Sequence, residues 1–319
     1  MRRTAQLLCP STVILAFVWV RWQRSANPQE CEEIGHKLSP FLMSALYRPF
    51  RAAEVDAARW EAGLGQATRQ QQPVAVWLVG PSAAGKSYLT HDVAKGFGIA
   101  FLPTDEPNAV LLDGSSFRNW HSGYQAVIQE GRRLHCVWRA AYPAMRSRLR
   151  HEKSRLLRRA TRDRLNVLIP HTCDYLSECA PLLYFLHRRG YTNHVVMVLG
   201  DREIIRKRGL RRARTTGKRY APEEWNESVS NGLHMIALAT GHAELVWTTP
   251  HTRWIVKKGQ PQDVFRAAAA RGIPEPLSQR IVKLDARGVA RMWTGVCESL
   301  CPSPFERLSR CFLLDTVEV

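Results

Sequence analysis

The sequence is poor in acidic residues. It has 28 aspartates and glutamates against 46 lysines and arginines, which gives a formal net charge of +18. Such a charge raises the local concentration of anions, so it favours nucleotides, sugar nucleotides, nucleic acid or acidic lipid as partners without choosing among them. Hydrophobic residues make up 45% of the 319 residues, which is typical of a globular protein with a sizeable core.

The chain also lacks the cysteine spacing of a zinc site. Its eight cysteines are scattered, and Cys297 and Cys301, which lie four residues apart, have no second pair or histidine cluster to complete a metal site. We therefore expect reduced, mostly buried thiols. No internal repeat and no low-complexity tract is present.

No hydrophobic run is long enough to cross a bilayer. The apolar stretch at residues 7–20 is interrupted by Pro10 and is shorter than the roughly 18 residues that a span needs. It is similar to a signal-peptide core or weak anchor, and the absence of acids before Glu30 is also typical of an organelle transit peptide. A buried segment or a start codon placed too far upstream are the alternatives. We expect a cytoplasmic protein, with membrane contact only through residues 7–20 if they are retained.

Beyond these absences, short apolar runs alternate with helical patterns along most of the chain. Strands are predicted at residues 74–80, 108–114, 165–172, 193–201 and 251–259. This alternation predicts a three-layer α/β fold with a parallel central sheet. The predicted organisation is an apolar N-terminal segment at 1–25, a helical lead-in at 26–72, the α/β domain at 73–258 and a C-terminal extension at 259–319.

The first predicted strand is followed by a phosphate-loop pattern, G-x-x-x-x-G-K-[ST]. Its glycines let backbone N–H groups approach phosphate oxygens, Lys86 reaches the β- and γ-phosphates, and the hydroxyl of Ser87 ligates Mg²⁺. A helix beginning at Lys86 points its positive end at the same charge. The sequence therefore predicts a nucleoside triphosphate site formed by Gly80, Pro81, Ser82, Ala83, Ala84, Gly85, Lys86, Ser87 and Tyr88.

The second predicted strand ends in a polar segment, DGSSFRNWHSGY. Asp113 lies at the carboxyl edge of the sheet, where it would ligate Mg²⁺ through water or act as a base for an acceptor hydroxyl. The alternative is that Asp113 caps a helix that starts near Ser116. Arg118 and His121 lie three residues apart, so they would reach one anion together or form part of a solvated helix face.

These motifs together resemble the zeta toxin family of P-loop kinases. The family pattern D-x-D-[ST]-F-[RK]-x-x-H-P-x-[FY] is matched at Asp113, Ser116, Phe117, Arg118, His121 and Tyr124. The resemblance covers about residues 74–256 and includes an arginine-rich lid at 202–219. It implies a kinase that uses ATP and Mg²⁺ to phosphorylate a nucleotide sugar such as UDP-N-acetylglucosamine. Arg219 is the best match to a phosphate-contacting lid arginine, followed by Arg208 or Arg211.

Two departures from the family pattern bear on catalysis. Ser115 replaces the second acid of D-x-D, and Pro170-His171-Thr172 replaces an E-G-T motif. Loss of a positioned general base costs about 10²–10⁴ in rate, although phosphoryl transfer depends more on positioning and charge neutralisation. We expect Lys86, Asp113 and Arg219 to be catalytic, Ser87 and Asp113 to hold Mg²⁺, and Ser115, Arg118 and His121 to face the acceptor.

Two other functions are compatible with the sequence. The first is a degenerate family member that binds ATP without transferring phosphate. The second is a nucleic-acid-associated ATPase, suggested by the charge and disfavoured because the basic stretches at 146–164 and 202–219 carry no interleaved aromatic residues.

Overall fold

We describe the fold from a computed structural model. The described residues are 29–270, apart from 102, 104–105, 217–219, 249–252 and 260. The expected N-terminal segment at 1–25, most of the C-terminal extension and Arg219 therefore lie outside the described residues. Within the described part of the chain, no helix is both long enough and apolar enough to cross a membrane.

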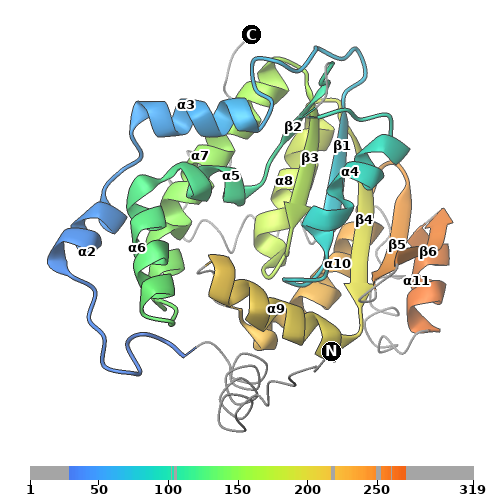
Figure 1. Ribbon diagram of the computed structural model, residues 1–319. Helices are drawn as coiled ribbons and strands as arrows, with labels where there is room; N and C mark the ends of the chain where they lie inside the picture. Colours follow the sequence, from blue (N-terminus) through green and yellow to red (C-terminus); the bar gives the residue numbers. More distant parts are fainter. Residues whose placement is uncertain are drawn as a thin grey trace, which may run out of the picture.

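A six-stranded sheet forms the centre of the molecule, in the order β2-β3-β1-β4-β5-β6 (Figure 1). Its strands are β1 (Val74–Val79), β2 (Ala109–Leu111), β3 (Asn166–His171), β4 (Thr192–Gly200), β5 (Ala243–Thr248) and β6 (Arg253–Gly259). The first five strands are parallel to one another, and β6 is antiparallel to β5. The predicted α/β fold with a parallel central sheet is confirmed.

The last two strands of the sheet differ from the sequence-based prediction. Strand β5 was not predicted, and the strand predicted at 251–259 was placed in the parallel series, whereas β6 runs antiparallel to β5. Only residues 249–252 connect these two strands. A connection this short joins antiparallel strands, because a parallel pair needs a crossover of a dozen or more residues.

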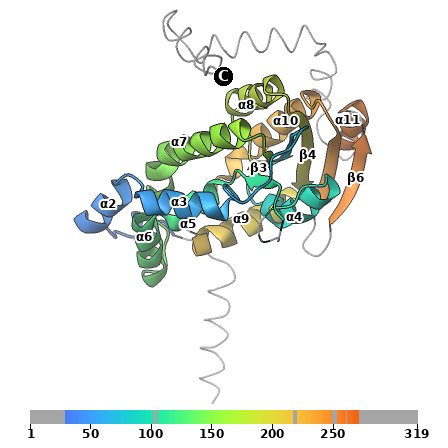
Figure 2. The ribbon, with the colours of Figure 1, turned by 90° about the horizontal axis from the view of Figure 1, so that it is seen from above.

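Helices cover both faces of the sheet, which gives the three predicted layers. One core contains Ala75, Trp77 and Val79 of β1, and the other contains Val76 and Leu78, as the alternation of side chains along a strand requires. The first face carries α7 (Ala141–Arg162), α8 (Leu176–Arg188), α10 (Trp225–Ala237) and α11 (Pro261–Ala269); the second carries α4 (Lys86–Gly96) and the start of α9 (Arg202–Thr216) (Figure 2).

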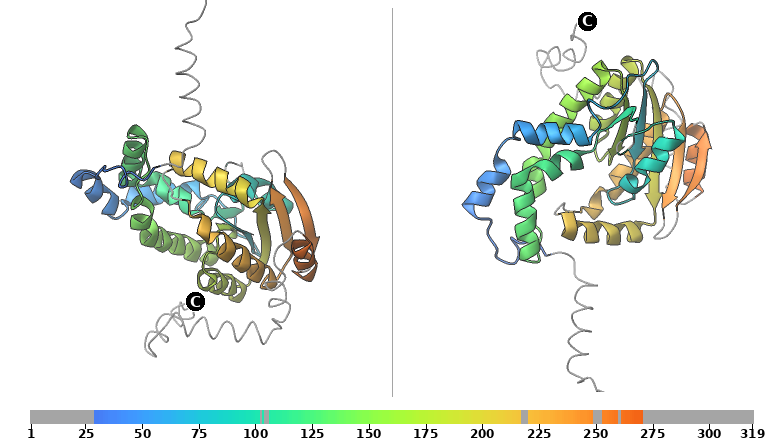
Figure 3. Two further views of the ribbon diagram at one scale, coloured as in Figure 1. Left: turned by 90° about the horizontal axis from the view of Figure 1, so that it is seen from below. Right: turned by 45° about the horizontal axis from the view of Figure 1, so that its top comes forward.

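A group of shorter helices extends beyond the β2 end of the sheet (Figure 3). It comprises α2 (Pro40–Tyr47), α3 (Ala52–Glu61), α5 (Gly114–Trp120) and α6 (Ser122–Arg133), in which α2 packs on α6 and α3 packs on α5. A single 3₁₀ turn at Pro222–Glu224 precedes α10. The helical lead-in therefore supports the segment that follows β2.

Four cysteines that were expected to be reduced form two disulfides. Cys31 is joined to Cys136, and Cys173 is joined to Cys179. All four are buried, as predicted, but the expected thiol state is wrong. The first pair is separated by 105 residues, so it is brought together by the fold and no local spacing in the sequence indicates it.

Candidate functional site

The phosphate loop connects β1 to α4 and is shaped by three residues with positive φ. Gly80 has φ 139°, Ala83 has φ 67° and Gly85 has φ 104°. A Cβ atom at Gly80 would lie 2.1 Å from the carbonyl oxygen of Val198 in β4, so only glycine fits there. Successive residues of alternating handedness make a concave turn of N–H groups that suits an anion.

Lys86 is the first residue of α4, and its ammonium group lies over the loop. It donates to the carbonyl oxygen of Gly80 at 2.6 Å and to that of Pro81 at 2.9 Å. The next two residues, Ser87 and Tyr88, are exposed. The first turn of α4 therefore carries a cation that contacts the loop and an exposed serine, at the positive end of the helix.

Thr248, the last residue of β5, contacts the phosphate loop through its side-chain hydroxyl. Its hydroxyl lies 2.8 Å from the carbonyl oxygen of Ala84 and 3.1 Å from that of Leu199. Arg208 of α9 donates to the same hydroxyl at 3.3 Å. Sequence analysis missed Thr248 because β5 was not predicted.

The lid helix α9 reaches the loop through Arg212. Its guanidinium donates to the hydroxyl of Ser82 at 2.7 Å. Burial and the neighbouring charge of Arg118 lower the pKa of Arg212, and the carboxylate of Asp113 opposes this shift. Arg208 lies one helical turn before Arg212 and also faces the loop region, whereas Arg211 is exposed. The i, i+4 spacing of Arg208 and Arg212 is the signal that separates them from Arg211.

Asp113 caps the helix that follows β2. Its Oδ1 accepts from the Ser115 amide at 3.0 Å, which is the N-cap arrangement considered from the sequence. Burial raises the pKa of Asp113, but hydrogen bonds from Ser115 and the charges of Lys153 and Arg118 outweigh it, and the net pKa is lowered. An ionised carboxylate with a lowered pKa suits cation binding better than proton abstraction.

Lys153 lies against the same turn, and sequence analysis missed it. It belongs to the basic stretch at 146–164, for which no site role was predicted, and a Cβ atom on Gly114 would lie 3.7 Å from its Cδ. Burial lowers the pKa of Lys153, against the attraction of Asp113. Lys153 precedes the buried Leu157 by one helical turn, so it points toward the sheet, and that spacing was the available signal.

A cavity of about 280 Å³ opens between α7, β3 and α8, beside Asp113. Arg150 and Lys153 contribute positive charge to its wall, and Glu178, which pairs with Arg150, contributes the acid. The remaining lining includes Leu112 and Ile169 from the ends of β2 and β3. The cavity therefore lies at the carboxyl edge of the sheet, where ligands of open α/β sheets bind.

His121 does not face an acceptor, which corrects the role expected from the sequence. It is fully buried, its Nδ1 accepts from the Tyr124 amide at 3.0 Å, and its Nε2 lies 3.2 Å from the carbonyl oxygen of Arg48. Burial lowers its pKa, which favours the neutral ring. Arg118 lies instead within 6.0 Å of the ring centroids of Tyr124 and Tyr142. His121 is thus a helix cap and core residue.

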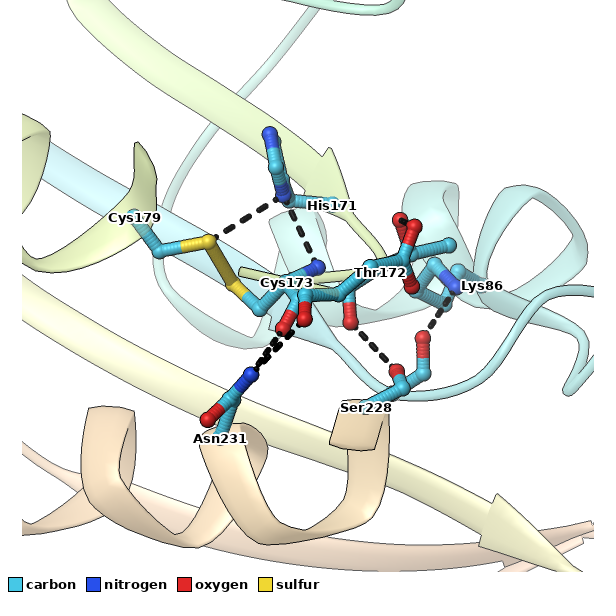
Figure 4. The surroundings of a disulfide bond; sticks show 9 residues. Lys86, His171, Thr172, Cys173, Cys179, Ser228 and Asn231 are labelled. Carbon is cyan, nitrogen blue, oxygen red and sulfur yellow. Dashed lines mark hydrogen bonds between the residues drawn. A yellow bond between two sulfur atoms is a disulfide. The ribbon is translucent and has the colours of Figure 1, made fainter. Parts of the chain in front are cut away.

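The residues in place of E-G-T lie beside the phosphate loop. In the sheet register, Pro170 is paired with Leu78 and His171 with Val79, the residue before Gly80. Ser228 of α10 donates to the carbonyl oxygen of Thr172 (Figure 4). The second departure from the family motif is therefore adjacent to the site and not remote from it.

A parallel sheet, a phosphate loop between β1 and α4, and an arginine-bearing helix over that loop define a P-loop protein of the kinase-like α/β class. Residues 59–268 match the family model described as Zeta toxin. This match covers more than half of the chain, and the chain belongs to the zeta toxin family.

One solved structure supports this fold. A structure from the PezAT chromosomal toxin-antitoxin system of Streptococcus pneumoniae matches with a TM-score of 0.53 and 16% identity, covering 78% of this chain and 98% of that chain. At that identity the likeness supports the fold alone. A structure of AvrRxo1-ORF1:-ORF2 with ATP gives a TM-score of 0.36 and 10% identity over 70% of this chain and 66% of that chain, too low to support any inference. No curated protein matches the chain significantly.

Proposed function

We propose that the protein is a kinase that transfers the γ-phosphate of Mg·ATP to a hydroxyl of a small acceptor, with a nucleotide sugar as the favoured class. The observation that carries the proposal is the 2.7 Å contact between Arg212 of the lid helix and Ser82 of the phosphate loop. It brings a guanidinium to the loop that would hold the triphosphate, where charge spreads over the oxygens of the transferred group.

The proposed nucleotide site uses the loop and its helix. The loop amides and Lys86 hold the phosphates, and Arg208 and Arg212 neutralise charge from the lid side. The hydroxyl of Ser87 and the carboxylate of Asp113 are oxygen ligands of the kind that Mg²⁺ prefers, so these residues fit a Mg²⁺ site. Arg219 is proposed as a further phosphate contact from its match to the family motif.

The proposed acceptor site is the cavity beside Asp113. Arg150 and Lys153 in its wall suit an acceptor that carries phosphate groups, as a nucleotide sugar does. Its volume of about 280 Å³ is close to the lower end of ligand pockets, roughly 300 Å³, so it would enclose one part of such an acceptor. Arg118 and Ser115 lie at the turn next to it and are proposed to contact the same ligand.

One observation favours a second candidate, an ATP-binding protein without phosphotransfer. Ser115 replaces the family's base, and its hydrogen bonds to Asp113 help to lower the pKa of that carboxyl. A carboxylate stabilised in this way is a weak proton acceptor. Transfer would then depend on positioning and charge neutralisation alone.

The two candidates are separated by one experiment. The protein is incubated with Mg·ATP and a panel of nucleotide sugars and nucleosides, wild type beside Lys86→Ala, and phosphorylated products are detected by mass spectrometry. ATP binding is measured in parallel by calorimetry. Product above the Lys86→Ala background supports the kinase. ATP binding without any such product supports the degenerate protein.

Association with nucleic acid is tested separately. Contacts between lysine or arginine side chains and phosphates release counterions, so their affinity must fall steeply with salt. We expect no RNA binding at physiological ionic strength. A complex whose affinity falls with salt in this way, together with ATP hydrolysis stimulated by RNA, would favour the ATPase alternative instead.

A further inference from the structure

A histidine and two cysteines meet at the end of β3, next to the phosphate loop (Figure 4). His171 is the last residue of β3, Cys173 follows in the loop, and Cys179 lies in the first turns of α8. One potential ligand atom from each residue lies within 4.8 Å of the other two. His171 Nδ1 is 3.3 Å from the sulfur of Cys179, and the two sulfurs are joined in a disulfide.

We propose that reduction of the Cys173–Cys179 disulfide creates a binding site for a soft divalent cation of the Zn²⁺ type, with both thiolates and the His171 imidazole as ligands. A dithiol reductant supplies two electrons and two protons, which break the S–S bond and leave two thiols, while the reductant becomes a disulfide. The cation then displaces the two thiol protons to solvent and bonds to both sulfurs and to Nδ1, which gives up the hydrogen bond that it accepts from the Cys173 amide at 2.9 Å.

The geometry of the site suits a tetrahedral ion. Zinc bonds sulfur at about 2.3 Å and imidazole nitrogen at about 2.0 Å, which places ligand atoms roughly 3.5–3.8 Å apart around a tetrahedral centre. The His171–Cys179 separation of 3.3 Å is already close to this value.

The loop that carries Cys173 is held without the disulfide. Asn231 of α10 donates its side-chain N–H groups to the carbonyl oxygens of Cys173 at 2.8 Å and Asp174 at 3.1 Å. Ser228, one turn earlier on α10, holds the carbonyl oxygen of Thr172. These three contacts are to the backbone, so they persist when the sulfurs separate. The loop that carries Cys173 is therefore positioned by α10.

The ligand type separates this site from the proposed Mg²⁺ site. Thiolate and imidazole ligands select Zn²⁺ and similar ions, whereas Mg²⁺ requires oxygen ligands. Three protein ligands also leave a fourth tetrahedral position open to water or substrate. His171 lines the cavity beside Lys153, so the site adjoins the proposed acceptor site. The inference does not depend on phosphotransfer, and its test is independent of activity.

The test uses cobalt as a spectroscopic probe of the full-length protein. Protein purified anaerobically under reducing conditions is titrated with Co²⁺, and thiolate-to-cobalt charge-transfer absorption is recorded. We expect absorption that saturates at one Co²⁺ per chain and disappears when Zn²⁺ is added. The same protein after oxidation should show none, and this comparison requires no substitution.

Variants assign the ligands. Cys173→Ser, Cys179→Ser and His171→Ala should each weaken Co²⁺ binding by at least tenfold, with circular dichroism as the check of folding. Cys297→Ser/Cys301→Ser, which removes two other cysteines spaced like metal ligands, should leave the absorption unchanged. The proposal is wrong if the reduced wild type shows no charge-transfer absorption, if the disulfide persists under reducing purification, or if only the Cys297/Cys301 variant abolishes binding.

Discussion

The phosphate loop and the acceptor edge lie at the same end of the sheet but are supported in different ways. We define the acceptor edge as residues 113–115 after β2 and residues 170–173 at the end of β3. The loop is shaped by its own glycines and by sheet neighbours such as Val198 and Thr248. The acceptor edge depends on side chains from distant helices, among them Lys153 of α7 and Asn231 of α10.

This difference explains why the two regions diverge unequally from the family pattern. The loop would bind phosphate through its backbone N–H groups, whose positions depend on one short motif. A substitution inside that motif therefore changes the conformation of the whole loop. The acceptor edge works through individual side chains, each of which can be replaced while the fold remains. Ser115 and Pro170 occupy positions where the family has acids, yet the parallel pairing of β3 with β1 is regular through Pro170.

The largest loss of stability and of ATP binding is expected from a substitution at Gly80, where the phosphate loop contacts β4. Gly80→Ala would place a Cβ atom 2.1 Å from the Val198 carbonyl oxygen at φ 139°. Positive-φ strain costs about 1–3 kcal/mol, and overpacking adds about 1–3 kcal/mol, so we expect unfolding at markedly lower urea concentration and loss of ATP binding.

The matched control is Gly96→Ala. Gly96 is the last residue of α4 and has open space around its Cα. Alanine there should leave stability unchanged or raise it by about 0.5 kcal/mol. Equal losses for both variants in urea unfolding would show that the loop is no more constrained than an exposed helix end.

The second effect is expected at the lid. Arg212→Ala removes the guanidinium that contacts Ser82, and loss of one preorganised donor to a developing charge costs about 10²–10³ in kcat. Arg211→Ala, one residue away on the exposed face of α9, should change kcat little. The measurement is steady-state phosphotransfer to an acceptor found with the panel of nucleotide sugars and nucleosides. Similar losses for both variants would mean that the lid acts through its net charge and not through one contact.

The sequence was sufficient to predict the loop because its determinants are consecutive residues. The strand–loop–helix pattern also predicted β1, α4 and most of the parallel sheet. Thr248 and Lys153 were missed because their roles arise from contacts across the fold, with Ala84 and with the turn at Gly114. The i, i+4 spacing places Arg208 and Arg212 on one face of α9 and Arg211 on another, but only the orientation of α9 over the sheet shows which face meets the loop.

His121 illustrates the opposite error. Its match to the family motif suggested contact with the acceptor, but the side chain is buried and hydrogen bonded to Tyr124 and Arg48. A motif residue can be retained because it holds two helices together, and a sequence pattern does not distinguish that role from ligand contact. The Cys31–Cys136 disulfide was missed for a related reason, since Cys31 finds its partner 105 residues away.

A third prediction sharpens the comparison by restoring an acid to the acceptor edge. Ser115→Asp introduces a carboxylate at the position of the family's base, while it removes a hydrogen bond that lowers the pKa of Asp113. Two carboxylates in one turn raise the pKa of one of them, which makes it a better base. We expect kcat for phosphotransfer to rise by at least about tenfold, toward the roughly 10²–10⁴ that a well-positioned general base contributes.

The control for Ser115→Asp is Ser115→Asn, whose side chain has nearly the shape of aspartate but carries no charge. Ser115→Asn should give no increase, because an amide cannot accept the proton. If the asparagine and aspartate variants have equal rates, general-base catalysis does not limit transfer, and positioning by the loop and the lid is the dominant factor.

The smallest effect is expected in the support of the acceptor edge. Glu54 of α3 accepts from both terminal nitrogens of Arg48 and from the Ser122 amide at 3.0 Å, where α5 meets α6. Burial raises the pKa of Glu54, but these bonds and that from the Arg51 amide outweigh it and lower the pKa to about 2. Glu54→Gln should therefore lose about 2 kcal/mol of unfolding free energy near neutral pH.

The contribution of Glu54 to the unfolding free energy is expected to depend on pH. Because the folded pKa of Glu54 lies below the ordinary glutamate value of 4.5, the stabilisation is complete above pH 4.5 and is lost as the pH falls toward 2. The difference in unfolding free energy between wild type and Glu54→Gln, measured by urea denaturation, should become smaller as the pH falls through that interval. Glu130→Gln removes a surface pair with Arg133, which water and salt screen, so its effect should be small at every pH. A difference for Glu54→Gln that stays constant from pH 7 to pH 3 would mean that packing of the side chain, and not its charge, holds α3 against the junction of α5 and α6.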